Sequence, residues 1–183
     1  MVAIVLAGCV AMTGCASRQA TNPESPSKSS PASDPIVERA LAGVETTGAP
    51  YISGEIVGYL VDFTVREGSD ARAIVEVVVM SDGSVRRLDT GGMNRPSGAF
   101  GRAPGDRLGP ESADETAARE LAIAKGRDVV VEKYPNMSEA ESVVYEYLVR
   151  LKAKDGTTLD VWVDVLGRGV NVAKPETLKP WRP

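Results

Sequence analysis

Residues 143–172, VVYEYLVRLKAKDGTTLDVWVDVLGRGVNV, carry the pattern that most constrains the fold of this chain. Apolar and polar residues alternate on both sides of Asp155-Gly156, a dipeptide typical of tight hairpin turns. Successive side chains of a strand point to opposite faces of a sheet, so the alternation predicts two strands with one buried face. A glycine turn at 166–169 and a short apolar segment at 170–172 follow. The stretch is therefore expected to form an antiparallel β-meander.

Residues 59–88 show the same order of features earlier in the chain. An alternating segment, a turn, a valine-rich return segment, a second turn and a short strand follow one another there. The correspondence suggests an internal repeat, although any two antiparallel meanders share these features.

A helix is predicted before each meander. Residues 36–44 form a short apolar segment with Asp34 as candidate cap. Ser112 and Glu115 are spaced as a capping box, in which the serine accepts a hydrogen bond from the amide of residue 115 and the glutamate side chain reaches back to the cap. Gly126 is expected to end this second helix. Its apolar stripe consists of Ala113, Ala117, Leu121 and Ala124, joined by Ala118 and Ala122.

These elements predict an α+β fold of two tandem α-β-β-β units, residues 36–90 and 112–174, with antiparallel meanders and each sheet covered on one face by a helix. The two units could lie side by side or merge into one longer sheet. Residues 91–111 are rich in Gly, Pro and Arg, lack periodicity and are interpreted as a linker loop. Residues 175–183 form a tail.

The second unit carries a set of motifs in order: an alanine-rich helix at 117–124, YLVRL at 147–151, Asp155-Gly156, VWVD at 161–164 and Gly167. In this order the unit resembles the PepSY-type domain of bacterial envelope proteins. The resemblance implies a non-catalytic module of the cell envelope, in some cases linked to inhibiting or regulating partner proteins such as peptidases. It implies no active-site residues.

The first residues of the chain predict an export signal. Residues 1–12, MVAIVLAGCVAM, are almost all apolar, too few to span a bilayer, which takes about 20, but enough for the core of a secretory signal. MTGC at 12–15 resembles the lipobox of bacterial lipoproteins, in which the cysteine receives a diacylglyceryl group and becomes the new N-terminus. LAGC at 6–9 is a second match with very little sequence before it. Residues 1–15 are therefore interpreted as a lipoprotein signal peptide, with Cys15 as the lipidated residue and Cys9 as the alternative.

Residues 16–35 are rich in Ser, Pro and Ala and are predicted to be a disordered tether. With the lipobox, the tether predicts an extracytoplasmic protein that a lipid holds at the cell membrane or cell envelope. An ordinary cleaved signal, or a buried apolar strand with incidental cysteines, is the alternative interpretation of the N-terminus.

The composition excludes several kinds of chemistry. The net charge of −4 gives no indication of the strongly basic surface that nucleic-acid binding requires. Histidine, the commonest general base and a frequent metal ligand, is absent, and both cysteines lie in the signal region. We therefore expect no catalytic residue, no metal site and no cofactor. Five carboxylates fall on the polar faces of the predicted strands, where a solvated surface, acid-base chemistry or calcium binding could use them: Asp62, Glu76, Glu146, Asp160 and Asp164.

Trp162 is the candidate centre of a binding surface. By strand parity it points away from the Val161 and Val163 face, together with Leu148 and Leu166. If the valine face is the core, these three side chains form an exposed apolar patch. Alternatively, the other unit or the C-terminal tail covers them.

Three arginines of the linker loop, Arg95, Arg102 and Arg107, are candidate contacts for anionic cell-wall polymer or lipid head groups, although an ordinary charged loop would show the same residues. The favoured hypothesis is a lipid-anchored envelope protein with a binding or regulatory role. The alternatives are an envelope hydrolase or enzyme accessory that uses surface carboxylates, and a structural spacer. A close carboxylate pair in a concave pocket would favour the enzyme.

Overall fold

The computed structural model describes residues 33–45, 51–67, 71–91, 107–135 and 140–180, and statements about the structure refer to these residues. Among them the chain is α+β, with one antiparallel six-stranded sheet, two α-helices and a short 3₁₀ helix. In chain order the elements are α1 (Pro35–Glu45), β1 (Tyr51–Glu67), β2 (Ala71–Met80), β3 (Val85–Gly91), α2 (Ala113–Lys133), β4 (Ala140–Ala153), β5 (Thr158–Asp164), β6 (Val170–Val172) and η2 (Pro175–Leu178). None of the described helices is long and apolar enough to cross a membrane.

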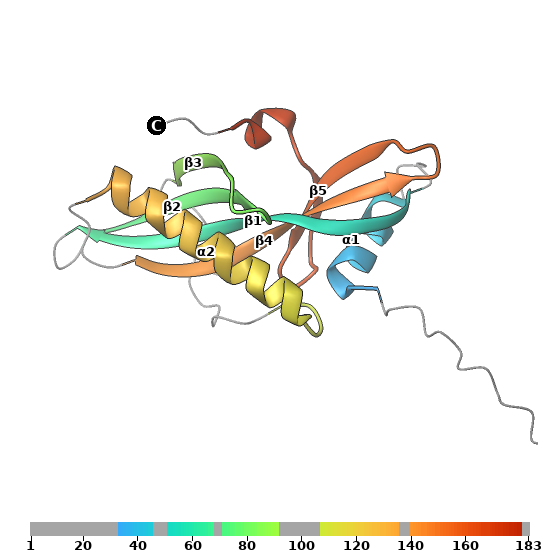
Figure 1. Cartoon of the computed structure of the whole chain (residues 1–183), viewed down its shortest axis with the longest axis horizontal. Coiled ribbons are helices and arrows are strands. Elements are labelled where there is room, and N and C mark those ends of the chain that lie inside the picture. The colour runs from blue at the N-terminus through green and yellow to red at the C-terminus, as the bar shows by residue number, and fades with distance from the viewer. Residues whose placement is uncertain (1–32, 46–50, 68–70, 92–106, 136–139, 181–183) are drawn as a thin grey trace, which may run out of the picture. The chain divides into compact units, whose positions relative to one another are not determined.

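The two predicted meanders share one sheet. Its strand order is β3-β2-β1-β4-β5-β6, and β1 pairs antiparallel with β4 at the centre (Figure 1). The alternative of one merged sheet is thus the one observed, and the prediction that each helix covers a sheet of its own is corrected. The long β1 and β4 strands make this possible, because β1 begins at Tyr51, eight residues before the predicted Tyr59.

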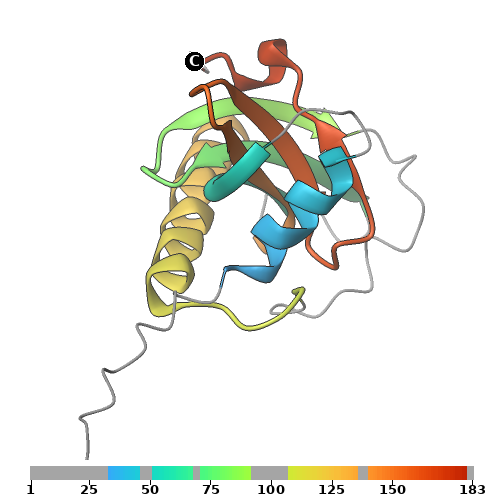
Figure 2. The same ribbon diagram turned by 90° about the vertical axis from the view of Figure 1, so that its right-hand side faces the viewer.

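Both helices pack on the same face of the sheet, and η2 lies on the other (Figures 1 and 2). The helices and the sheet enclose one apolar core, and its largest buried side chains include Tyr59, Tyr147, Phe63, Ile36 and Leu151. Val161 and Val163 belong to this core, as their parity predicts. Burying branched apolar side chains of this kind contributes about 1.5–3 kcal/mol each.

The central β1–β4 pair has three register shifts, one of them at Ile52 in β1, and the other two place the same irregularity in both strands. The register shifts at Val57 in β1 and at Tyr145 in β4, where the strand carries one extra residue. The carbonyl of Val57 accepts a hydrogen bond from Ser81 N (2.9 Å), and that of Tyr145 accepts one from Val165 N (3.2 Å). Each donor comes directly after the second strand of its own meander. In both meanders, therefore, the bulged residue of the first strand accepts a hydrogen bond from the residue that begins the second turn.

The predicted helix starts are confirmed. The Ile36 amide donates to Asp34 Oδ1 (2.7 Å), and the Glu115 amide donates to Ser112 Oγ (3.2 Å). The predicted end of the second helix is wrong, because α2 continues through Gly126 to Lys133. Gly126 is buried against Phe63, and a Cβ atom there would lie 2.8 Å from the ring. This glycine permits close approach of helix and sheet.

The predicted apolar stripe of α2 faces the core only in part. Ala122 is buried and Ala118 packs against the core, whereas Ala113, Ala117, Leu121 and Ala124 are exposed. The buried face continues through Gly126 and Val130, and Gly126 allows the helix to approach Phe63 closely.

Candidate functional site

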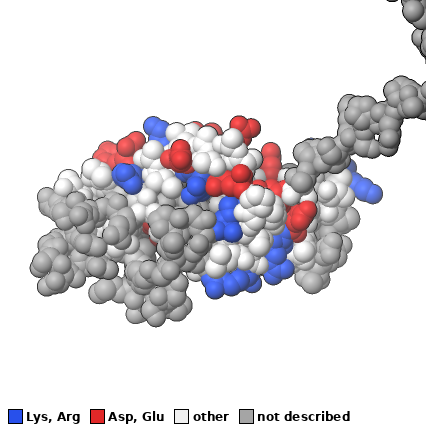
Figure 3. Space-filling view, turned by 90° about the horizontal axis from the view of Figure 1, so that it is seen from below, with Lys and Arg blue, Asp and Glu red and all other residues white. Residues whose placement is uncertain are grey.

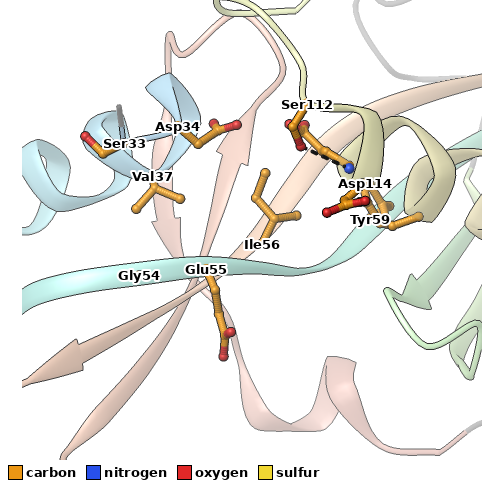
Figure 4. A pocket seen from close by; sticks show the side chains of 11 residues that line it. Ser33, Asp34, Val37, Gly54, Glu55, Ile56, Tyr59, Ser112 and Asp114 are labelled. Atoms are coloured by element: carbon orange, nitrogen blue, oxygen red, sulfur yellow. Dashed lines mark hydrogen bonds between the residues drawn. The ribbon is translucent and has the colours of Figure 1, made fainter. Parts of the chain in front are cut away.

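The N-termini of α1 and α2 converge over the centre of the sheet and border a cavity of about 360 Å³. Figure 4 shows Asp34 pointing toward Ser112 across this space, with Ile56 pointing into it from β1, while Glu55 points to the opposite side of the strand. The lining residues are Ser33, Asp34, Val37, Gly54, Glu55, Ile56, Tyr59, Ser112, Asp114, Glu115 and Ala118.

Arg107 lies beside the cavity, and its side chain is only 5% exposed. Its Nη2 atom donates to Asp34 Oδ2 (2.8 Å) and to Glu115 Oε1 (2.5 Å), so one guanidinium joins the starts of both helices. Its Nη1 atom donates to the carbonyls of Leu108 (3.1 Å) and Gly109 (3.2 Å), and also to that of Pro110. The guanidinium carbon lies 5.4 Å from the centroid of the Tyr147 ring.

The charge of Arg107 is fixed by these contacts. Burial alone would lower the pKa of the guanidinium, but the hydrogen bonds and the negative charges of Asp34 and Glu115 raise it above its ordinary value. Arg107 is therefore always a cation, and its charge is already matched inside the protein.

Glu115 is the carboxyl group that the site perturbs most. Burial and the neighbouring Asp34 raise its pKa to about 7, although the Arg107 charge opposes the shift. Its side chain is 7% exposed, and Oε2 has no hydrogen-bond partner among the described residues. A buried polar atom without a partner is costly, and Arg107 Nε is a second such atom among the described residues of this cluster.

The capping box is realised only in part. The Ser112 hydroxyl does accept from the Glu115 amide, but the Glu115 side chain bonds Arg107 rather than returning to the cap. The electrostatic attraction of a buried arginine outweighs the ordinary capping contact.

Two tyrosines form the base of the site. Tyr59 and Tyr147 are paired across β1 and β4, and each follows the bulge of its strand by two residues. Their rings meet edge to face, with centroids 5.6 Å apart. Burial raises the pKa of both hydroxyls, so both stay neutral.

Of the predicted anion contacts, Arg107 is corrected: it is buried and salt-bridged to internal carboxylates rather than offered to solvent. Arg95 and Arg102 lie outside the described residues, as do Cys9 and Cys15. Acidic and basic side chains both occur on the part of this face that Figure 3 draws in colour, with basic groups gathered along its lower edge.

The predicted Trp162 patch is also corrected. Leu148 and Trp162 are cross-strand partners, but Leu148 is 0% exposed and packs with Val57 and Ala173. Trp162 is half-buried against this cluster, to which Leu178 of η2 also belongs, so the C-terminal segment covers the face as the alternative expected. Leu166 packs against the helix-side core instead.

Four of the predicted surface carboxylates form two cross-strand pairs, Asp62 with Glu76 and Glu146 with Asp164. Asp160 forms a two-point salt bridge with Arg150 (2.8 and 2.9 Å), and Asp164 accepts a hydrogen bond from the Leu166 amide. Glu76 and Glu146 border a smaller hollow of about 180 Å³ beside Trp162. The part of the chain that the structure describes holds no group of three or more His, Cys, Asp or Glu side chains able to bind a metal ion.

Sequence reasoning did not identify the Asp34–Arg107–Glu115 cluster as a site, because Asp34 and Arg107 are 73 residues apart and each half looks like an ordinary helix start or loop. No protein-family model, curated protein or solved structure matches this chain. Its function is therefore inferred from its own residues and geometry.

Proposed function

We propose that this chain is a lipid-anchored, extracytoplasmic module of the cell envelope with a non-catalytic binding or regulatory role, and that it binds its ligand in the cavity between α1 and α2. The observation that carries the proposal is a cavity of about 360 Å³ at the starts of both helices, which has the buried Glu115 among its lining residues. Binding sites are typically concave, largely apolar and equipped with a few convergent polar groups, and they measure about 300–1,000 Å³.

The contacts within the site favour binding over catalysis. Asp34 uses one carboxylate oxygen as the α1 cap and the other for Arg107, so it has little capacity left to act as a base. Arg107 is held by internal partners. Three of the four carboxylate oxygens of Asp34 and Glu115 are thus held by contacts within the protein.

The sequence supports the anchoring part of the proposal. The apolar start, the cysteine at its end and the polar tether together fit a lipoprotein, with Cys15 favoured over Cys9 as the lipidated residue. One acyl chain holds a protein only marginally, whereas two or more give durable anchoring. The tether would let the folded part reach partners at the envelope surface.

We also propose that the two halves are related α-β-β-β units of PepSY-like type. The helix-then-three-strands order occurs twice, and the bulges at Val57 and Tyr145 occupy the same place in their halves. Gly83 and Gly167 both adopt positive φ in the turns before β3 and β6. These matched irregularities support a duplication more than the strand alternation does.

A hydrolase is the second candidate, and it is favoured by the closeness of Asp34 and Glu115 in the concave site, both bound to the same Arg107 atom. A carboxyl with a pKa raised to about 7, close to a second carboxyl group, is a pattern of general acid catalysis. If the protein is a hydrolase, the whole chain should hydrolyse chromogenic glycosides, and Glu115→Gln should abolish this hydrolysis. If the wild-type chain turns over none of them, the hydrolase loses its support.

Photo-crosslinking tests the binding role. A benzoylphenylalanine at Ala118, which lines the cavity, is expected to give a defined adduct in the native membrane. The same group at Ala124, exposed on the same helix, is the matched control. No adduct from position 118, or the same adducts from both positions, would contradict a ligand in this cavity.

A further inference from the structure

We propose that Asp34 and Glu115 share one proton, and that this proton clasps the start of α1 to the start of α2. When the proton is lost to solvent, Glu115 forms a two-point salt bridge with Arg107, and the start of α1 is released. The inference concerns a conformational device of the fold and does not depend on what the cavity binds. Its basis is the competition of two carboxyl groups for one guanidinium.

Arg107 offers one positive charge to two carboxyl groups. Its Nη2 atom donates to Asp34 Oδ2 (2.8 Å) and to Glu115 Oε1 (2.5 Å), so these two oxygens flank the same nitrogen. Two ionised carboxylates would leave one negative charge unmatched beside a guanidinium that is only 5% exposed, which is costly where water is excluded. One retained proton removes that excess charge, as it does in other close carboxyl pairs.

The titration of Glu115 agrees with a shared proton. Burial raises its pKa most, and a hydrogen bond with the Asp34 side chain raises it further, to about 7, against the opposing charge of Arg107. Because the two carboxyl groups are hydrogen-bonded, the titration belongs to the pair rather than to either residue alone. The pair therefore changes its charge near neutral pH.

Two atoms that the clasped state leaves unused indicate the second state. Arg107 Nε and Glu115 Oε2 are both buried, and neither has a hydrogen-bond partner among the described residues. Elsewhere in the chain, Arg150 uses Nε and Nη2 together to hold Asp160 (2.8 and 2.9 Å). The same two donors of Arg107 would hold both oxygens of an ionised Glu115, and such forked pairs are stronger than single contacts.

Asp34 is the carboxylate that leaves. Its side chain is 25% exposed, against 7% for Glu115, so water solvates a released Asp34 more readily. Ile36 and Ala40 are wholly buried and keep the rest of α1 on the sheet, so the release is limited to the first turn of the helix. Asp34 and Glu115 both line the cavity, and the release therefore widens the cavity between the two helix starts.

The remaining ionisable groups around the pair do not account for a change near neutral pH. They come from the segment before α2, from α2 itself and from the two central strands: Arg107, Glu111, Asp114, Arg119, Tyr59 and Tyr147. Burial raises the pKa of both tyrosine hydroxyls, which stay neutral. Glu111 and Arg119 form a salt bridge with each other (2.8 Å), and Asp114 is exposed at the cavity rim.

The test is hydrogen exchange of the full chain, held in detergent micelles, at about pH 6 and about pH 8. The Glu38 amide donates to the Asp34 carbonyl (2.9 Å) in the first turn of α1, and the Thr116 amide donates to the Ser112 carbonyl (2.9 Å) in the first turn of α2. After correction for the intrinsic pH dependence of exchange, Glu38 should exchange about fivefold faster at the higher pH, whereas Thr116 should not change. The Arg107 Nε–H signal in ¹⁵N spectra should move downfield over the same range, because its hydrogen bond forms there.

The variants assign the change to the pair. Glu115→Gln has no proton to release at this position, so Glu38 should exchange slowly at both pH values. Asp34→Asn removes the shared proton, so the Arg107 Nε–H signal should have its bonded position already at about pH 6. Asp114→Asn, at the exposed rim of the same cavity, is the matched control and should behave as the wild type does. Equal Glu38 exchange at both pH values in the wild type, or pH-dependent exchange that persists in Glu115→Gln, overturns the inference.

Discussion

Arg107 and Glu115 form a salt bridge, 2.5 Å from Nη2 to Oε1, in which both side chains are more than nine-tenths buried. The glutamate carries the capping-box spacing of α2 but turns to the arginine that precedes the helix. The contact joins the end of the linker to the start of the helix. Because Asp34 bonds the same Nη2 atom, it also joins α2 to α1.

Arg107→Met is expected to destabilise the protein by about 3–5 kcal/mol, because it leaves the buried Glu115 and the partly buried Asp34 without their cation. Urea unfolding of the full chain measures this loss. The control is Arg168→Met, whose side chain is 66% exposed and 3.7 Å from Asp164, and it should change stability by less than about 1 kcal/mol. Comparable losses in the two variants would contradict a central role for Arg107.

The stability of the protein should fall as pH rises through the titration of Glu115. Its folded pKa is about 7, against an ordinary value of 4.5, so between these values the folded chain holds a proton that the unfolded chain has released. Stability from this group is therefore present below about pH 4.5 and lost by about pH 7. In the Glu115→Gln variant the unfolding free energy should fall by about 1–2 kcal/mol less over this pH range than in the wild type. One pKa unit corresponds to about 1.4 kcal/mol, and solvent screens part of the effect.

Thermal unfolding between about pH 5 and pH 8 measures this dependence. Glu132→Gln, on the exposed side of α2, should keep the wild-type profile. If the stability of Glu115→Gln fell with pH as steeply as that of the wild type, groups other than Glu115 would cause the fall.

Gly126→Ala should destabilise the protein by about 1–3 kcal/mol, although alanine is the better helix former, because the new methyl group meets the Phe63 ring. The double variant with Phe63→Leu should recover part of the loss, as measured in a double-mutant cycle. A stabilised Gly126→Ala protein would show that the helix can move away from the sheet at no cost.

Leu148→Ala should cost about 2–5 kcal/mol of unfolding free energy, since Leu148 is wholly buried under the C-terminal segment. Val172→Ala, at a side chain that is 56% exposed, should be nearly neutral. If Leu148→Ala left the unfolding free energy almost unchanged, Leu148 would instead be exposed, as the patch predicted from sequence requires.

Lipidation is tested by labelling growing cells with radioactive palmitate. Cys15→Ser should abolish incorporation and release the protein from the membrane, because Cys15 is the favoured lipobox cysteine, at the end of the apolar segment. Cys9→Ser should label normally. If Cys9→Ser abolished incorporation and Cys15→Ser did not, Cys9 would be the lipidated residue.

The α+β class, the strand alternation and both helix starts were predictable from sequence, because each depends on residues that are close along the chain. The capping residues Asp34 and Ser112 act on amides two or three positions away. The alternating positions of the valines in β5 are enough to predict which face of the strand is buried. Local periodicity and local hydrogen bonds determine such features before any tertiary contact forms.

Only the tertiary structure decided which faces are covered and which polar groups meet. The exposed alanines of α2, the burial of Leu148 under the C-terminal segment and the Asp34–Arg107–Glu115 cluster depend on contacts between distant segments. Gly126 became a packing position rather than a helix end because Phe63 comes to lie against it. The sequence by itself determined the elements and their order, whereas the pairing of β1 with β4 brought the two helix N-termini together and made the cavity.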